Sequence, residues 1–173
     1  MHQLKRRRQW RVFGIAASAV MGLTVTIATP VAAAANTSRL SADLDGVPIA
    51  LADVGLYHCH DFDAPRIHCF TTTGQRDAAV GGTAALAATS VAYVVIYDQA
   101  SFAGPSMVLS DDYSVLALIG WNDRISSFKG QGSQSGRFWT DWFGGGSPYS
   151  FCCNQQVSSL GSYDNTFSSV NRT

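Results

Sequence analysis

Two short stretches of oxygen-bearing side chains are the residues of this chain best suited to chemistry. The sequence NDRISS at 122–127 recurs 42 positions later as DNTFSS at 164–169, so an acid/amide pair precedes a serine pair in both. Carboxylate, amide and hydroxyl oxygens in a tight loop suit a hard cation such as calcium, which takes about six to eight oxygen ligands. The alternative is that both loops only cap the fold with hydrogen bonds and bind nothing.

A second pattern, aromatic-x-x-x-x-aromatic-x-Gly, precedes each of these stretches. Its two copies lie 41 positions apart. Two motifs that repeat in the same order indicate that one structural unit is used twice. The members are Tyr97, Phe102 and Gly104 in the first copy and Phe138, Phe143 and Gly145 in the second.

Short apolar or alternating segments predict the strands that position these motifs. A unit of about 40 residues is too small for a core of its own, so we expect the two units to pack face to face as a β-sandwich. All twelve acids are Asp, which favours turns over long helices. The expected strands cover 92–97, 105–110 and 125–129 in the first copy, and 137–142, 148–153 and 167–171 in the second.

These residues resemble the βγ-crystallin family, whose domain is a pair of Greek-key units, each marked by the aromatic-glycine pattern and a later serine. The later serines here are Ser127 and Ser169. The resemblance covers roughly residues 93–173 and implies an all-β fold, with two Greek-key units at about 92–131 and 136–173 in a β-sandwich. The glycine permits a turn that a Cβ would hinder, and the serine satisfies backbone groups of the folded hairpin.

In microbial members of this family, two Asn/Asp, two variable residues, Ser/Thr and Ser mark a calcium site. The resemblance therefore implies up to two Ca²⁺ ions, with the second acid/amide of one unit reaching the ion of the other. Few charged ligands imply weak sites, of micromolar to millimolar dissociation constant. The cation of Arg124 is expected to weaken one site by repulsion. The implied ligands are side-chain oxygens of Asp123, Asn165, Ser126 and Ser168, backbone carbonyls of Arg124 and Thr166, and, as further carbonyl ligands, Asp98 and Trp139.

Residues 1–35 are predicted to be a secretory signal peptide rather than part of the fold. A basic head is followed by an apolar run and an Ala-rich cleavage site. The alternative is an uncleaved anchor helix. Without this segment, seven basic and twelve acidic residues leave a net charge of −5, which argues against nucleic acid or an anionic membrane as partner. We expect a secreted monomer, and the low lysine content fits an actinobacterial source.

The next segment, 36–91, is expected to be an N-terminal extension ahead of the domain at 92–173. Cys59 and Cys69 flank a short loop in it, and a disulfide between them is the simplest pairing in an exported protein. Its Ala/Gly-rich end, 71–89, predicts a connector with one helical turn near 84–88. The adjacent Cys152 and Cys153 either form a vicinal disulfide or pair elsewhere, and the sequence does not choose.

Other residues suggest further chemistry less directly. His58, His60 and His68 beside the cysteine loop suggest zinc or copper, against which a disulfide is the simpler interpretation. The sequence holds no G-x-S-x-G, H-E-x-x-H or paired-carboxylate arrangement, so we expect that the protein is not an enzyme. A group of aromatic residues predicts either core packing or an exposed patch for sugars or a partner. They are Trp121, Trp139, Trp142, Phe138 and Phe143.

The leading hypothesis is a secreted, non-enzymatic calcium-binding protein whose fold calcium stabilises, because calcium binds only the native state. The alternative is a secreted inhibitor of metalloproteases, since small actinobacterial inhibitors look similar to one pair of βγ-crystallin units and the cysteine loop could present a rigid segment. A further alternative is an antimicrobial toxin-like or surface-binding module.

Overall fold

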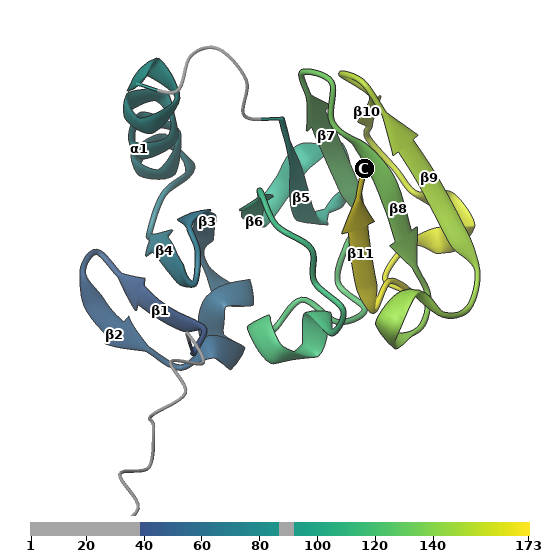
Figure 1. Cartoon of the computed structure of the whole chain (residues 1–173), viewed down its shortest axis with the longest axis horizontal. Coiled ribbons are helices and arrows are strands. Elements are labelled where there is room, and N and C mark those ends of the chain that lie inside the picture. Colours follow the sequence, from purple (N-terminus) through teal and green to yellow (C-terminus); the bar gives the residue numbers. More distant parts are fainter. Residues whose placement is uncertain (1–38, 87–91) are drawn as a thin grey trace, which may run out of the picture. The chain divides into compact units, whose positions relative to one another are not determined.

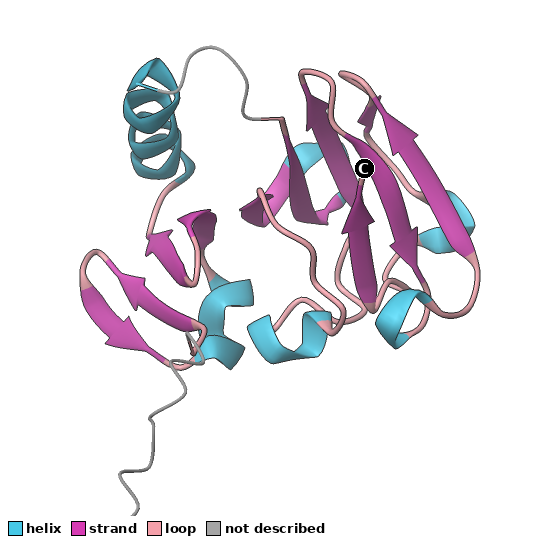
Figure 2. Ribbon diagram, in the orientation of Figure 1, coloured by secondary structure: helices cyan, strands magenta, loops and turns pink. Residues whose placement is uncertain are grey.

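A computed structural model describes residues 39–86 and 92–173, so the predicted signal peptide lies outside the described residues. The described chain is mostly β-strand, arranged in one eight-stranded and one three-stranded sheet (Figures 1 and 2). No helix in these two ranges is long and apolar enough to span a membrane. The prediction of an all-β architecture is confirmed.

Each repeated unit contributes three antiparallel strands, the first of which lies between the other two. In the first unit β5 lies between β6 and β7, and in the second β8 lies between β9 and β11. All six expected strands are present, with ends shifted by about two residues. Their bounds are β5 Tyr93–Gln99, β6 Ala103–Leu109, β7 Ser127–Gln131, β8 Ser135–Trp139, β9 Pro148–Cys152 and β11 Ser169–Arg172.

The two units exchange short strands, which makes their folding interdependent. Strand β10, Gln156–Val157 of the second unit, pairs with β7 of the first. In return Tyr113 of the first unit forms a β-bridge with Val170 in β11 of the second. Each sheet is thus completed by a segment of the other unit, which is the Greek-key arrangement that the repeated motifs predicted.

The disulfide-containing N-terminal extension expected from the sequence is instead part of the structured sheet. Strand β3 pairs in parallel with β6, with His58 opposite Ser106, and thereby covers the edge of the first unit. Strand β4 pairs with β3, β1 with β4, and β2 with β1. An uncovered edge strand invites pairing with other chains, so this addition protects β6. The bounds are β1 Ser41–Leu44, β2 Val47–Ile49, β3 His58–Asp63 and β4 Arg66–Phe70.

The connector contains a much longer helix than the single turn predicted near 84–88. Helix α1 runs over Thr73–Leu86 and contacts β3 and β4. Its Val80 packs with Val95 and Val108 in a small apolar cluster, while Arg76 is buried with its guanidinium bonded to the hydroxyl of Ser106. This packing explains a helix in an Ala/Gly-rich segment of modest helix propensity.

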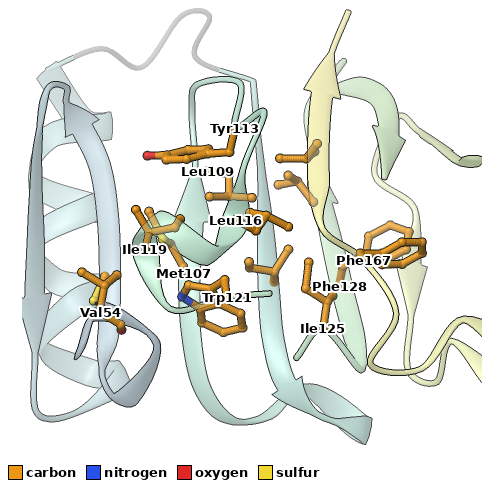
Figure 3. Packing of buried hydrophobic residues seen from close by; sticks show 14 of the residues in the cluster. Val54, Met107, Leu109, Tyr113, Leu116, Ile119, Trp121, Ile125, Phe128 and Phe167 are labelled. Carbon is orange, nitrogen blue, oxygen red and sulfur yellow. The ribbon is translucent and has the colours of Figure 1, made fainter. Parts of the chain in front are cut away.

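The main core lies between the two sheets and extends to the first four strands. Trp121, Phe128 and Phe167 are fully buried within it (Figure 3). Phe138 belongs to the same core and packs against Phe128 with ring centroids 5.3 Å apart. Five short 3-10 helices complete the described chain: η1 Leu51–Leu56, η2 Ala100–Phe102, η3 Leu116–Ile119, η4 Trp142–Gly144 and η5 Gly161–Tyr163.

Candidate metal-binding loops

The last serine of each motif fastens a folded hairpin in the same way in both units. The Oγ of Ser127 accepts from the N–H of Phe102 at 3.1 Å and donates to the carbonyl of Gln99 at 2.7 Å. The Oγ of Ser169 accepts from the N–H of Gly144 at 3.1 Å and donates to the carbonyl of Asp141 at 2.7 Å. Corresponding residues are therefore 42 positions apart in this part of the fold.

This register corrects the second copy of the aromatic pattern by one residue. Trp139, not Phe138, corresponds to Tyr97, because Trp139 lies opposite Ser169 as Tyr97 lies opposite Ser127. The side chain of Phe138 points into the core instead. Two further pairs of corresponding residues share a left-handed backbone. Phe102 and Gly144 have φ of 62° and 73°, and Gly104 and Gly146 have φ of 75° and 72°. Gly145, by contrast, has φ −92°.

The corrected register shows that the two hairpin corners are filled differently. In the first unit the ring of Phe102 packs edge-on against Tyr97, with centroids 5.7 Å apart. In the second unit a glycine replaces that aromatic residue. A Cβ on Gly144 would lie 3.3 Å from the Oδ1 of Asn171 and 3.7 Å from the Nε1 of Trp139, so the indole lies beside the space that a side chain at 144 would enter.

The candidate ligands of the first ion come together from three separate segments. The Oγ of Ser126 lies 3.1 Å from the carbonyl oxygen of Asp98 and 3.2 Å from the Oδ1 of Asn165. Two of these residues belong to the first unit and Asn165 to the second, as the exchanged arrangement implied. A cluster of uncharged oxygens of this kind fits a hard cation and would bind it weakly.

The loop backbones of the two motifs are held together reciprocally. The N–H of Asp123 donates to the carbonyl of Phe167 at 3.0 Å, and the N–H of Asn165 donates to the carbonyl of Ile125 at 3.1 Å. Both donors have left-handed φ, 53° at Asp123 and 54° at Asn165. Asn and Asp tolerate this conformation better than most residues, which explains why the second motif position is an acid or amide.

The second candidate site differs in one expected ligand. The carbonyl of Trp139 accepts from the N–H of Ser168 at 2.8 Å, as the carbonyl of Tyr97 accepts from Ser126. The residue that corresponds to Asp98 is therefore Thr140, whose carbonyl takes the place that was assigned to Trp139. The two candidate side-chain ligands of the second site differ in exposure. Ser168 is buried and Asp123 is exposed. The carboxylate of Asp123 accepts a hydrogen bond from the Nδ2 of Asn122 at 2.6 Å.

The guanidinium of Arg124 is paired rather than facing the loop alone. Its Nε donates to the Oδ1 of Asp98 at 2.7 Å, and its Nη1 donates to the carbonyl of Gly120 at 3.2 Å. The charged group also lies over the ring of Trp121, 5.7 Å from its centroid. The carboxylate beside the first site is thus neutralised by a cation of the same loop.

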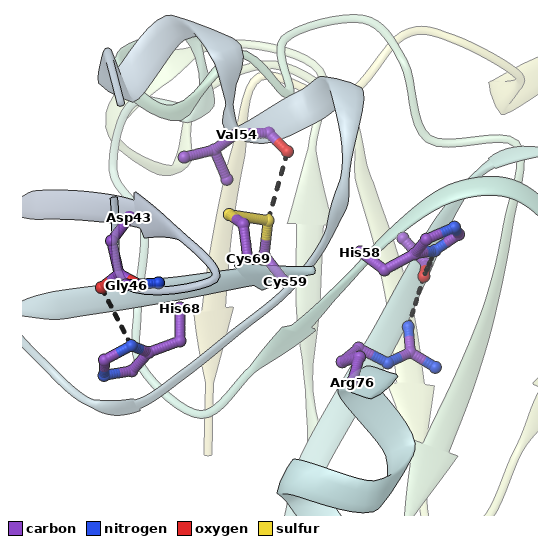
Figure 4. The surroundings of a disulfide bond; sticks show 9 residues. Asp43, Gly46, Val54, His58, Cys59, His68, Cys69 and Arg76 are labelled. Carbon is purple, nitrogen blue, oxygen red and sulfur yellow. Dashed lines mark hydrogen bonds and ion pairs between the residues drawn. A yellow bond between two sulfur atoms is a disulfide. The ribbon is translucent and has the colours of Figure 1, made fainter. Parts of the chain in front are cut away.

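The cysteine loop contains the predicted disulfide between Cys59, near the start of β3, and Cys69, near the end of β4 (Figure 4). The nearby His68 pairs with Asp43 at 2.9 Å and with Asp63 at 3.3 Å. Across residues 39–86 and 92–173, no group of three or more His, Cys, Asp or Glu side chains could hold a metal. The geometry therefore gives no support to zinc or copper here.

The structure answers two other questions that the sequence left open. Cys152 and Cys153 form a vicinal disulfide. The aromatic group divides: Trp121 and Phe138 are buried, Trp139 is half-buried, and Trp142 and Phe143 are exposed. The predicted aromatic patch therefore exists for only part of the group.

The paired Greek keys, the exchanged strands and the serine-fastened hairpins together define the class: residues 93–173 form a βγ-crystallin-type domain. Solved structures to which the chain is similar are βγ-crystallin domains. One from an archaeon is 29% identical, covering 49% of this chain and 100% of that chain, with a TM-score of 0.43. Another, from Ciona intestinalis, is 23% identical, covering 47% and 99%, with a TM-score of 0.43. A third, from Flavobacterium johnsoniae, is 24% identical, covering 49% and 94%, with a TM-score of 0.42. No protein-family model and no curated protein matches the sequence.

Proposed function

We propose that this chain is an extracellular, non-enzymatic βγ-crystallin-type protein that binds up to two calcium ions and is stabilised by them. The observation that carries the proposal is the position of the Ser126 hydroxyl between the carbonyl of Asp98 and the amide oxygen of Asn165. The disulfides of the chain fit an oxidising compartment.

Each ion would be held by ligands of both units. The first site would use the side chains of Ser126 and Asn165 and the carbonyls of Asp98 and Arg124. The second would use the side chains of Ser168 and Asp123 and the carbonyls of Thr166 and Thr140. Calcium supplies a double positive charge that these oxygens share, and the protein supplies an arrangement that exists only when both units are folded.

Stabilisation follows from this dependence on the fold. A ligand that binds only the folded state stabilises it by about 2.7 kcal/mol for each site when its free concentration is 100 times the dissociation constant. A pair of weak sites therefore suits an extracellular protein, because calcium outside cells reaches millimolar concentration and weak extracellular modules bind in that range.

Isothermal titration of calcium into chelator-treated protein tests the proposal, with thermal unfolding measured in calcium and in chelator. We expect about two ions per chain and a higher melting temperature in calcium. Ser168→Ala should lose one ion, and Ser150→Ala, an exposed serine of β9, should lose none. Equal melting temperatures and no heat of binding would reject calcium binding.

A second candidate function is inhibition of an extracellular metalloprotease. The observation in its favour is the tip between β3 and β4, where the residues from Asp63 to Arg66 are all exposed and the Cys59–Cys69 disulfide joins the two strands behind them. A loop fixed in this way would lose little conformational entropy on binding a protease. Assays of thermolysin with micromolar protein test it, and an unchanged rate of peptide hydrolysis would reject it.

A further inference from the structure

Large apolar side chains are exposed on two of the short 3-10 helices. Leu118 of η3 is 63% exposed, and Trp142 and Phe143 of η4 are 54% and 77% exposed. Single exposed apolar residues are ordinary on protein surfaces, but a group of them marks an interaction site.

The backbone and the indole of this group are held in place before any partner binds. Phe143 has φ 56°, a conformation that is costly for a bulky side chain, and its N–H donates to the carbonyl of Ser114 at 2.8 Å. The Nε1 of Trp142 donates to the Oδ1 of Asn122 at 3.2 Å. Prearranged aromatic anchors lower the entropic cost of binding.

Leu118 and Phe143 also line one groove of about 500 Å³. Leu40, Pro65 and Val115 contribute further apolar surface to it, and the exposed Asp111 and Asp112 lie at the same groove. Of the two acids, Asp112 is partly compensated, because its Oδ1 accepts from the N–H of Arg172 at 2.7 Å. The groove thus combines an apolar surface with two carboxylates.

We propose that this groove binds an extended segment of another polypeptide that presents an apolar side chain next to a lysine or arginine. The apolar side chain would lie between Leu118 and Phe143, and the cation would lie beside Asp111. An anionic bilayer fits this groove less well than a basic peptide. Its headgroups would meet these carboxylates, on a chain whose net charge is −5 without residues 1–35. The proposal does not depend on calcium, since no candidate ligand lines the groove.

Titration of the blocked peptide Ac-Ala-Leu-Arg-Ala-NH2 into ¹⁵N-labelled protein tests this assignment by amide chemical shifts. We expect chemical-shift changes at residues 115–118 and 143. Removing the apolar contact or the charge contact, from either the peptide or the protein, should weaken binding about tenfold. The peptides Ac-Ala-Ser-Arg-Ala-NH2 and Ac-Ala-Leu-Gln-Ala-NH2 should bind correspondingly less. Phe143→Ser should weaken binding of the first peptide by removing the apolar contact with its leucine. Asp111→Asn should weaken it by removing the charge that faces its arginine.

The variants are chosen so that folding does not confuse the result. Serine is compatible with the backbone at position 143, because Ser101 holds the corresponding place in the first unit with φ 58°. Val47→Asn, at an apolar residue that is 65% exposed on the β1–β2 hairpin, should leave binding unchanged. The proposal is overturned if no shifts occur, if the three peptides bind equally, or if Val47→Asn weakens binding as much as Phe143→Ser. It is also overturned if only phosphatidylserine vesicles bind in a Phe143-dependent way.

Discussion

The hydroxyl of Ser126 lies 3.2 Å from the amide oxygen of Asn165, although 39 residues separate them along the chain. If both hold one ion, Ser126→Ala and Asn165→Ala should remove the same ion, so the double variant should bind no less calcium than either single one. Ser126→Ala with Asp123→Ala should instead remove both ions. Calorimetric stoichiometry of the four variants decides this, and loss of both ions from Ser126→Ala with Asn165→Ala would show that the sites are not exchanged.

Arg124→Gln should strengthen the first calcium site by about three- to tenfold, because it frees the Asp98 carboxylate and removes a nearby cation. The same variant should be about 1 kcal/mol less stable without calcium, because it loses the hydrogen bond to the Gly120 carbonyl and the cation–π contact with Trp121. Calcium titrations and urea unfolding measure the two effects. Arg137→Gln, which removes a cation lying over Trp139, is the matched control and should leave affinity unchanged.

Ser127→Ala and Ser169→Ala should destabilise the calcium-free protein by similar amounts, about 1–3 kcal/mol each, because each removes two partly buried hydrogen bonds worth about 0.5–1.5 kcal/mol apiece. The midpoints of urea unfolding in chelator measure this. Ser150→Ala, an exposed serine in β9, should change the midpoint little. A clear difference between the two buried serines would argue that the hairpins are not equivalent in energy.

Stability should fall as the pH drops from about 6.5 towards 4, owing in part to His60. Burial, and then the neighbouring His68, lower the pKa of His60 from 6.5 to about 4. The unfolded chain therefore binds more protons in this window, so the contribution is fully present above pH 6.5 and is lost as the pH approaches 4. The free energy of unfolding, measured with urea across this range, should depend less on pH in His60→Phe than in the parent protein. The other titrating groups are the same in the two proteins. An identical slope in the two would contradict this role.

Most strands of residues 93–173 were predictable because their signals are local. Short apolar or alternating segments located every strand in this range except the two-residue β10, and the doubled serine motif located the hairpins. The pairing of β3 with β6 was not predictable, because parallel pairing over a long separation leaves no periodic signal in either strand. Helix α1 was also missed beyond one turn, since the packing that supports it involves residues far along the chain.

The one-residue error in the second aromatic pattern has a specific cause. The run FWTDWFGGG fits the pattern from Phe138 and also partly from Trp139, because it has extra aromatic residues and glycines. The spacing of 42 between the serine motifs was the signal that could have decided it. Successive residues of a strand face opposite sides, so a slip of one turns Phe138 from the core to the outer face. The same slip assigned a ligand carbonyl to Trp139 in place of Thr140.

The difference between the two hairpin corners restricts how this sequence can evolve. The first corner holds the two rings of Tyr97 and Phe102, and the second holds the one larger ring of Trp139 beside Gly144. Phenylalanine at 144 would compete with the indole for space, and tyrosine at 139 would leave a hole. Neither change is neutral alone, so descendants of this chain should alter the two positions as a pair or not at all.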